Sequence, residues 1–447
     1  MGKKVFYGFG GLSYSVISQT VSNFFMFFAT SVMGLKGVLV GVAVAISTIW
    51  DGISDTIVGF LSDNKPMGKM GKRNGYMLIA TIGMSIFNIV LWVIPSTLSS
   101  GLKFVWILIS LFLLETFNTM FATPYSALGN DMATSYDDRT KINAYNTVFY
   151  LIGIIIPSVL LVIFLPNTDE YPIGQLNPAG YIKIAITTST ICLLFGLMSS
   201  ILTIPKEKNE NNKSKTKFSL KELYKSFLKS FSSKKLNKLI LGYVFTSIAT
   251  VFLCSVGLHF FTYSFFYTSN QIMGLLLTLL LGTIISQPVW VLISKKKKKK
   301  PALILGILVT IFSVFGIISL YIFRIELYKI SYFLMLCLIL LCGVGSGSIY
   351  TLPVSLYGDA IDSMSVSKNK MATYGGMLTF AGNIANSITQ FLVGILLDVI
   401  KFDSAKEVQS LGVQTGLALI VFVGIEASLI LGCLTFASYK EKSEKIN

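Results

Sequence analysis

Long apolar runs, separated by short polar segments, extend along the whole chain of 447 residues. A helix needs about 20 mainly apolar residues to cross roughly 30 Å of hydrocarbon. The runs of that length cover residues 9–32, 37–61, 76–95, 103–128, 143–165, 180–204, 238–263, 271–294, 301–323, 330–357, 371–398 and 413–438. The pattern predicts an all-α membrane protein with twelve transmembrane helices.

The composition supports this interpretation. Hydrophobic residues make up 53% of the chain and charged residues only 13%, whereas a soluble domain has about 25% charged residues. The first apolar run is too long and too aromatic for a cleaved signal peptide, and no small-residue cleavage site follows it. We therefore expect the first run to stay in the membrane as a helix.

A charged, Asn- and Lys-rich segment divides the predicted helices six plus six. It cannot be buried in lipid, so we expect an N-terminal six-helix bundle over residues 1–204, a cytoplasmic linker over 205–237 and a C-terminal six-helix bundle over 238–447. Within the linker, SLKELYKSFLKSF (219–231) has helical periodicity with one apolar side. This pattern predicts a short amphipathic helix on the membrane surface.

The net charge of +16 is an orientation signal. Counted from an amino terminus on the inside, 30 of the 37 basic residues fall on one side of the membrane. A nucleic-acid-binding surface would not require that distribution, whereas the positive-inside rule does. We therefore expect both termini in the cytoplasm, the lipid bilayer as a partner, and no nucleic-acid partner.

The two halves resemble each other in sequence. TPYSALGNDM follows the fourth apolar run and LPVSLYGDAID follows the tenth, at an offset of 229 residues. That offset pairs Pro124 with Pro353, Ser126 with Ser355, Gly129 with Gly358 and Tyr145 with Tyr374. A duplicated six-helix unit is typical of secondary transporters in which two bundles rock around a central site.

Two acids interrupt the second apolar run, in IWDGISDTIVG. A charge at the centre of a transmembrane helix costs about 2.5–3.5 kcal/mol on insertion scales. Asp51 and Asp55 are four residues apart and share one helix face, with Ser54 beside them. Each acid could pair with a base on another helix, but the central thirds of the predicted helices contain no basic residue. This favours a cation site, for sodium, which prefers oxygen ligands, or for a proton.

The loop after the second run, GFLSDNKPMGKMGKR (59–73), resembles the corresponding loop of the major facilitator superfamily. In that superfamily, the aspartate and the basic cluster form salt bridges that break and re-form as the bundles rock. The equivalent loop of the second half keeps its bases, in KKKKKK (295–300), but has Ser294 in place of the acid. The resemblance implies the major facilitator fold and a gating role for this loop.

The chain also resembles one family within that superfamily, the glycoside-pentoside-hexuronide cation symporters, which include melibiose permease. The resemblance rests on YGFG (7–10), IWDGISDTIVGFLSD (49–63), the TPYSALGNDM and DDRTKINAY segments (123–145), and LPVSLYGDAID with GGMLTFAGNIANSITQFLVG (352–394). It implies a monomeric symporter in the cytoplasmic membrane of a prokaryote that imports a small-molecule substrate with a coupling cation, Na⁺ or H⁺, and uses no cofactor.

The family's cation site maps onto the acids of the second run. The matching positions are Asp51, Ser54, Asp55 and, in the fourth run, Thr119. Ser54 replaces an asparagine that is common in the family, which leaves sodium and proton coupling both open. Glu115 lies four residues before Thr119 and hence on the same face. A third carboxylate near the site strengthens the case for a proton.

The family's sugar-binding charges are missing from this chain. Sugar-transporting relatives have charged residues at positions that match Ser15, Ala122, Asn146 and Asn383 here. Neutral groups could bind a sugar or glycoside instead, and a less polar solute or a lysolipid would suit such a site equally well. Besides Ser15, Asn146 and Asn383, the candidate substrate contacts are Gln19, Asn386 and Gln390, with Tyr14, Tyr125 and Tyr350 as stacking or interface-packing aromatics.

The resemblance also suggests gating residues near the cytoplasmic ends of the helices. Asp359 and Asp362 would pair with loop bases such as Lys368 and Lys370. With the loop after the second run, the gating set is Asp63, Lys72, Arg73, Arg139, Asp359 and Asp362.

Other classes of function fit the sequence less well. There is no nucleophile-and-base pair, metal triad or phosphate loop, so we do not expect an enzyme. The five cysteines lie inside predicted helices without metal-ligand spacing, and we expect core thiols and no metal site. A receptor or scaffold would gain nothing from paired acids, whereas a proton-driven exporter of the same superfamily remains an alternative.

Overall fold

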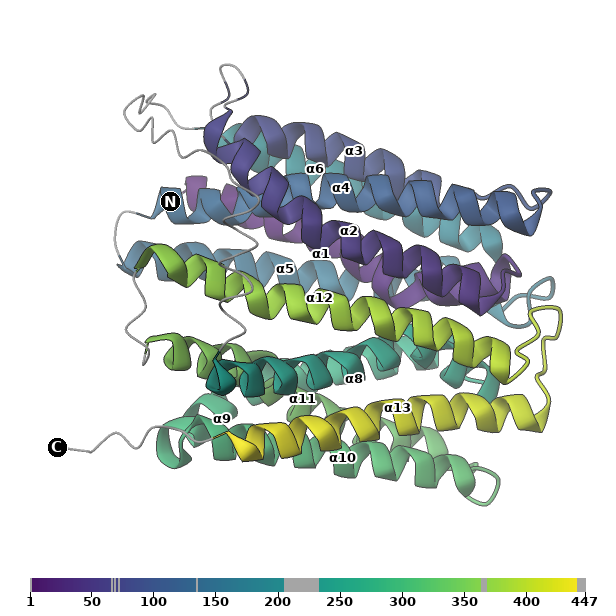
Figure 1. Cartoon of the computed structure of the whole chain (residues 1–447). Helices are drawn as coiled ribbons and strands as arrows, with labels where there is room; N and C mark the ends of the chain where they lie inside the picture. Colours follow the sequence, from purple (N-terminus) through teal and green to yellow (C-terminus); the bar gives the residue numbers. More distant parts are fainter. Residues whose placement is uncertain are drawn as a thin grey trace. The chain divides into compact units, whose positions relative to one another are not determined.

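A computed structural model describes residues 2–65, 67, 70, 73–133, 136–204, 233–362 and 368–439. Its helices are drawn in Figure 1. The first six are α1 (Gly2–Phe27, continued by a π-helical turn over Phe28–Val32), α2 (Gly37–Asn64), α3 (Asn74–Trp92), α4 (Ser100–Met132), α5 (Tyr136–Phe164) and α6 (Pro178–Leu202). The second six are α8 (Lys234–Ser264), α9 (Ser269–Lys297), α10 (Lys299–Ile322), α11 (Ser331–Asp362), α12 (Lys368–Val399) and α13 (Leu411–Ser438). All twelve predicted helices are confirmed.

Several helices are longer than the apolar runs predicted. α4 has 33 residues and α11 has 32, because each continues through the polar motif that follows its apolar run. α4 and α11 also contain a proline at the paired positions Pro124 and Pro353. The apolar pattern therefore marks the thickness of the hydrocarbon, whereas the helix itself extends beyond it.

Eleven of the described helices are long and apolar enough to cross a membrane, and α1 is not among them. α1 is rich in Gly and Ser, and its polar residues Ser13, Ser15 and Thr20 are buried. It packs on α5 and α6, and the Ser13 hydroxyl donates a 2.9 Å hydrogen bond to the Cys192 carbonyl on α6. Because neighbouring helices cover it, α1 does not need an apolar exterior.

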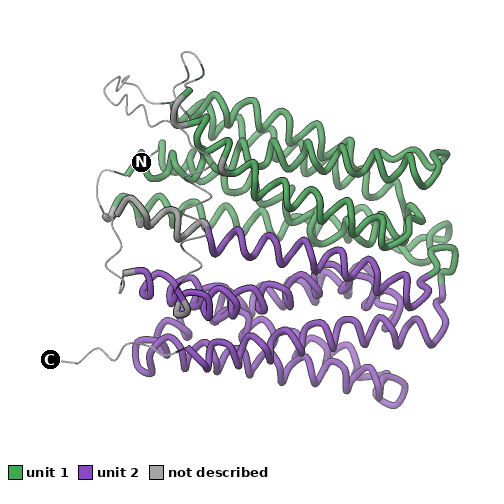
Figure 2. The backbone as a smooth tube through the Cα atoms, in the orientation of Figure 1, with its two compact units in different colours: residues 1–218, 403–407 green, residues 219–402, 408–447 purple. Residues whose placement is uncertain are grey.

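The contacts divide the chain into two compact units, coloured separately in Figure 2. Unit 1 comprises residues 1–218 and 403–407, and unit 2 comprises residues 219–402 and 408–447. The predicted amphipathic helix at 219–231 lies outside the described residues.

Buried polar groups join helices inside unit 1. The Asn88 side-chain amide of α3 donates to the Ala185 carbonyl at 3.2 Å and to the Thr188 and Ser189 hydroxyls at 3.1 and 2.9 Å, all on α6. Such bonds hold transmembrane helices together where the hydrophobic effect cannot, since lipid tails are as apolar as the side chains.

Inside unit 2, small residues allow close helix contacts. A Cβ at Gly343 of α11 would lie 2.3 Å from the Leu279 carbonyl oxygen of α9, so only glycine fits there. The Trp290 indole of α9 also donates a 2.7 Å bond to the Val344 carbonyl of α11.

The cysteine prediction is wrong at one position. Cys192 and Cys342 are buried as expected and Cys254 and Cys433 are half-buried, but Cys337 on α11 is exposed. A thiol is a small, weakly polar group, so the outer surface of a membrane helix accepts it as readily as a core does.

Candidate functional site

α2 and α4 lie side by side in unit 1 (Figure 1) and are joined by two carboxylate–hydroxyl pairs. The Thr119 hydroxyl donates to the Asp51 carboxylate at 2.7 Å, and the Thr123 hydroxyl donates to the Asp55 carboxylate at 2.9 Å. Both pairs are separated by 68 residues in sequence, so the two helices run in the same direction and the pairs form successive rungs one turn apart.

Ser54 completes an oxygen-rich group between the two helices. Its hydroxyl lies 3.0 Å from the Thr119 hydroxyl and 3.0 Å from the Asp51 backbone carbonyl. Ser54 and Thr119 expose only 2% and 1% of their surface. Carboxylate, hydroxyl and carbonyl oxygens close together are the ligands that hard cations prefer, so the group is suited to a sodium ion or a proton.

Trp50 adds an aromatic contact between the same two helices. Its ring stacks on Phe112 with centroids 4.5 Å apart, and its indole donates a 2.8 Å bond to the Thr116 hydroxyl. The α2–α4 pair is therefore held by polar and aromatic contacts on the turn that precedes Asp51.

Glu115 lies close enough to Asp51 for their charges to interact. Its carboxylate accepts a 3.1 Å bond from the Asn118 amide. The described residues include no group of three His, Cys, Asp or Glu side chains placed to share a metal ion. The role of Glu115 in the cation site stays a prediction, supported by its interaction with Asp51.

Sequence reasoning missed Thr123 and Asn118, although a signal for Thr123 was present. Thr119 and Thr123 have the same four-residue spacing as Asp51 and Asp55. Two helices that run in the same direction place equally spaced residues opposite each other, so this spacing indicated the second rung.

A second polar cluster joins α1, α4 and α5. Tyr7 of α1 and Tyr125 of α4 stack with centroids 4.3 Å apart and an interplanar angle of 12°. The Tyr125 hydroxyl donates to the Tyr7 carbonyl at 2.9 Å, and the Tyr7 hydroxyl donates to the Tyr125 carbonyl at 3.2 Å. The Tyr125 hydroxyl also lies 2.8 Å from the Asn146 side-chain oxygen of α5, so Tyr125 joins all three helices.

The glycines of two sequence motifs make room for this cluster. A Cβ at Gly10 would lie 2.4 Å from the Tyr125 ring, and one at Gly11 would lie 2.3 Å from the Asn146 side-chain oxygen. A Cβ at Gly129 would lie 2.3 Å from the Tyr7 hydroxyl. Gly10 and Gly129 are therefore required by the close approach of the two tyrosines, and Gly11 by that of Asn146.

A cavity of about 280 Å³ lies beside this cluster, and none of the described residues that line it is charged. Its polar lining consists mainly of tyrosine hydroxyls and asparagine amides, with Ala122 among the small residues. The polar lining residues include Tyr7, Tyr14, Tyr125, Tyr150, Asn143 and Asn146. Such a lining can stack on a ring and hydrogen-bond to neutral hydroxyl groups.

Three of the predicted substrate residues, Tyr14, Tyr125 and Asn146, therefore line one cavity, whereas Ser15 is not among its lining residues. The Ser15 side chain is fully buried, its hydroxyl bonds the Leu12 carbonyl at 3.3 Å, and a Cβ at Gly153 of α5 would lie 1.9 Å from it. Ser15 thus fills the contact between α1 and α5. Gln19 is half-buried beside the Tyr150 side chain.

The predicted substrate residues of unit 2 lie in α11 and α12. Tyr350 exposes 57% of its surface. Asn383 is half-buried, and the Asn386 side-chain oxygen is buried with no hydrogen-bond partner among the described residues. Gln390 accepts a 2.9 Å bond from Ser255 on α8. Asn386 therefore has capacity for a further hydrogen bond.

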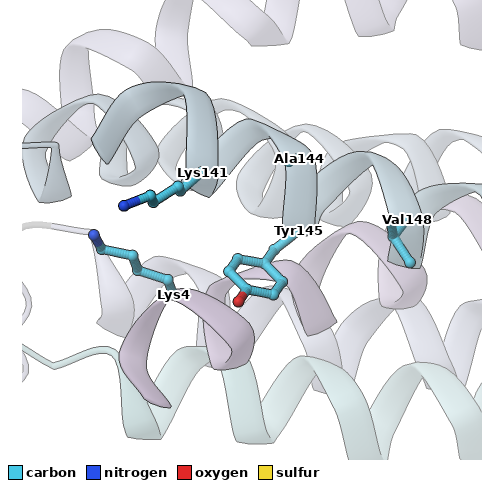
Figure 3. Close-up of a pocket in the computed structure, with 5 residues that line it drawn as sticks. All are labelled: Lys4, Lys141, Ala144, Tyr145 and Val148. Atoms are coloured by element: carbon cyan, nitrogen blue, oxygen red, sulfur yellow. The ribbon is translucent and has the colours of Figure 1, made fainter. Parts of the chain in front are cut away.

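Unit 1 also has a groove of about 520 Å³ along α1 and α5 (Figure 3). Lys4 and Lys141 lie at one end, and Ala144, Tyr145 and Val148 continue along α5. Lys4 forms an ion pair with Asp138. The groove thus combines a basic end with a mainly apolar wall.

Two ion pairs join the third and fourth helices of each half near their ends. Arg73, before α3, pairs with Asp131 of α4 at 2.6 Å, and Lys299, at the start of α10, pairs with Asp359 of α11 at 2.6 Å. The sequence suggested Lys368 and Lys370 for Asp359, so the observed partner is a different base. The side chains of Asp63, Asp362, Lys368 and Lys370, and the whole of Lys72, lie outside the described residues.

Arg139, a predicted gating residue, contacts α4. Its guanidinium donates a 2.6 Å hydrogen bond to the side-chain oxygen of Asn130, near the end of α4. This bond connects the start of α5 to α4 through a neutral acceptor.

Comparison with known proteins agrees with this architecture. The family model described as MFS/sugar transport protein matches residues 6–441. The chain is 22% identical to the sodium-dependent lysophosphatidylcholine symporter 1-A of Danio rerio, over 99% of this chain and 86% of that protein. It is 24% identical to the symporter YjmB of Bacillus subtilis, over 96% and 88% of the two chains.

A solved structure shares the fold. The crystal structure of the nucleoside transporter NupG superposes with a TM-score of 0.66 at 15% identity, covering 99% of this chain and all of that one. The predicted fold class, an all-α membrane protein of major facilitator type, is confirmed. The chain matches a transporter family, in agreement with the prediction that it is not an enzyme. The chain belongs to the MFS/sugar transport protein family and, within the major facilitator superfamily, is a multi-pass membrane transporter of the glycoside-pentoside-hexuronide symporter group.

Proposed function

We propose that the protein is a cation-coupled symporter that imports a small neutral polar solute of the sugar or glycoside type by alternating access. It would act as a monomer in the cytoplasmic membrane of a prokaryote, with both termini in the cytoplasm. The observation that carries the proposal is the pair of Asp–Thr rungs, Asp51 with Thr119 and Asp55 with Thr123.

The rungs support a coupling site because they link two helices through groups that a cation changes. A bound sodium ion or proton neutralises the carboxylates. Each threonine hydroxyl then no longer donates to a charged carboxylate; its oxygen instead binds the sodium ion or accepts a hydrogen bond from the protonated acid. The positions of α2 and α4 therefore depend on occupancy. Glu115, near Asp51, favours uptake of a proton by the same group.

α4 also carries the solute cavity, and this supplies a route for coupling. Tyr125 lies six residues after Thr119, a rise of about 9 Å along the helix. A shift of α4 on cation binding moves Tyr125 relative to Tyr7 and Asn146, which changes the cavity. The effect must be reciprocal, so solute binding raises the affinity for the cation by the same factor.

The cavity supports a small neutral solute as the cargo. Its volume of about 280 Å³ lies just below the roughly 300–1,000 Å³ typical of ligand sites, which favours a small solute. Its neutral lining matches a polyhydroxylated ring without ionised groups. The four family charges absent from the sequence are consistent with this choice.

A second candidate cargo is a lysolipid. Two observations favour it: the similarity to the sodium-dependent lysophosphatidylcholine symporter 1-A, and the larger groove with Lys4 and Lys141 at one end. An amphiphile could place an anionic headgroup at the lysines and its chain along the apolar wall.

The two cargoes can be separated by uptake into proteoliposomes. Purified protein would be reconstituted and offered labelled sugars, glycosides or lysolipids, with an imposed sodium gradient, an imposed proton gradient, or neither. We expect gradient-driven accumulation of a sugar-class solute, and loss of that accumulation in Tyr125→Ala. Accumulation of lysolipid alone would establish the second candidate, and efflux driven by a proton gradient would establish an exporter.

A further inference from the structure

The middle of α13 contains a buried acid that the proposed coupling site does not use. Glu426 lies at the centre of this 28-residue helix, and therefore near the middle of the bilayer. Only 5% of its surface is exposed, and neither carboxyl oxygen has a hydrogen-bond partner among the described residues. Glu426 also forms no ion pair with any of the described residues.

Neighbouring contacts show which way Glu426 faces. Thr415 lies 3.2 Å from the Tyr321 hydroxyl of α10, and Phe422 packs edge-on against Phe315 of α10 with centroids 5.6 Å apart. Glu426 follows Phe422 by one helical turn and so shares its face. The opposite face of α13 contacts α8, because a Cβ at Gly424 would lie 2.5 Å from the Phe252 ring. Glu426 therefore points toward α10.

A titratable group of α11 interacts with Glu426. The buried thiol of Cys342 interacts electrostatically with Glu426, and the Ser346 hydroxyl bonds the Cys342 carbonyl at 2.8 Å. On α10, the titratable group on the shared face is Tyr321, which lies about three turns away at the level of Thr415. On α8, no titratable group is recorded as interacting with Glu426. No cation among the described groups on these helices is positioned to balance a carboxylate.

We propose that Glu426 is a proton-binding site of unit 2, separate from the α2–α4 group in unit 1. A carboxylate at this depth without a cation or donor is strongly disfavoured, whereas a neutral carboxylic acid is tolerated. Glu426 therefore holds a proton in the conformation described. It releases the proton only when the face of α13 toward α10 is opened to water, so proton release is tied to a change of conformation in unit 2.

The site does not depend on the identity of the solute or of the coupling ion. If Asp51 and Asp55 bind sodium, Glu426 adds a pH dependence that remains in Asp51→Asn. The proposal can therefore fail while the proposed symport holds, and the reverse is also true.

Carbodiimide labelling of the full-length protein in lipid nanodiscs tests the proposal. Dicyclohexylcarbodiimide is apolar and reacts with protonated carboxyl groups in apolar surroundings, whereas a charged carbodiimide reaches only groups in contact with water. Peptide mass spectrometry should find Glu426 modified by the apolar reagent and not by the charged one. Glu326, which is exposed between α10 and α11, should show the reverse preference. Modification of Glu426 by the charged reagent to the extent seen for Glu326 would overturn the proposal.

Thermal unfolding as a function of pH provides a test that does not depend on access of the reagent. An acid that is protonated in the fold and ionises on unfolding makes the wild type less stable as pH rises. Glu426→Gln keeps the neutral shape and removes this loss, so the difference in Tm between variant and wild type should grow with pH. Glu326→Gln serves as the matched control and should show a constant difference. A difference that is flat or falls with pH for Glu426→Gln would show that the acid is ionised in the fold, contrary to the proposal.

Discussion

Thr119 of α4 donates a 2.7 Å hydrogen bond to the Asp51 carboxylate of α2, and one turn further along Thr123 repeats the arrangement with Asp55. The equal spacing on both helices makes the two bonds a pair, so a single sliding or tilting motion of α4 affects both. This arrangement gives each of the two acids a hydrogen-bond donor within the membrane, and it lies where the proposed cation would contact both helices.

Removing one rung should weaken cation binding without abolishing it. Thr123→Val keeps the shape of the side chain and deletes the hydroxyl that bonds Asp55. We expect a loss of about 1 kcal/mol of stability, since a typical hydrogen bond contributes roughly that much, and a severalfold lower affinity for the coupling cation. Cation titrations followed by thermal unfolding measure both effects.

Thr190→Val is the matched control for this variant. Thr190 is exposed on α6, and its hydroxyl bonds only the Ile186 carbonyl of its own helix among the contacts recorded. Equal losses of cation affinity in the two variants would show that the Thr123 hydroxyl has no special role.

The close packing of α1 against α4 should make Gly10 intolerant of substitution. A Cβ there would lie 2.4 Å from the Tyr125 ring, and forcing extra atoms into a packed interior costs about 1–3 kcal/mol. Gly10→Ala should therefore lower the unfolding temperature. Gly101→Ala, where a Cβ meets nothing within 4 Å, should leave it unchanged or raise it slightly through better helix propensity.

The Tyr125 hydroxyl should matter more for the solute than for the fold. Tyr125→Phe keeps the stacking on Tyr7 but removes the contacts with the Tyr7 carbonyl and with Asn146. We expect a loss of about 1 kcal/mol in stability and at least a fivefold weaker solute affinity, measured as the concentration that gives a half-maximal thermal shift. Unchanged solute affinity would place the solute outside this cavity.

The ion pairs near the helix ends should affect transport more than stability. Asp131 and Asp359 each expose 57% of their side chain, and exposed pairs contribute roughly 0–1 kcal/mol. A double-mutant cycle on Arg73 and Asp131 should give a coupling energy in that range, while uptake slows in both single variants. Charge exchange, Arg73→Asp with Asp131→Arg, should restore part of the rate. A coupling energy of several kcal/mol would mean that the pair is structural.

Sequence reasoning located the helices and the acids but not the contacts between helices. Apolar runs mark spans because the bilayer imposes one length on all of them, and Asp51 and Asp55 stand out because charge is rare there. The tyrosine pair was hidden, since a single tyrosine gives no information about its register with another helix. The lysine run was ambiguous for the same reason: six identical residues at 295–300 do not show which one meets Asp359.

The most direct test of cation coupling is the sodium and pH dependence of thermal unfolding in the wild type, Asp51→Asn, Asp55→Asn and, as a control, Asp169→Asn in an exposed loop. A ligand that binds only the folded state at a hundred times its dissociation constant stabilises it by about 2.7 kcal/mol. We predict such stabilisation, by sodium or by protons, for the wild type and for Asp169→Asn. In both other variants we predict the loss of the sodium effect and of the part of the proton effect that Glu426→Gln does not remove. Stabilisation that persists unchanged in Asp51→Asn and Asp55→Asn would contradict the account.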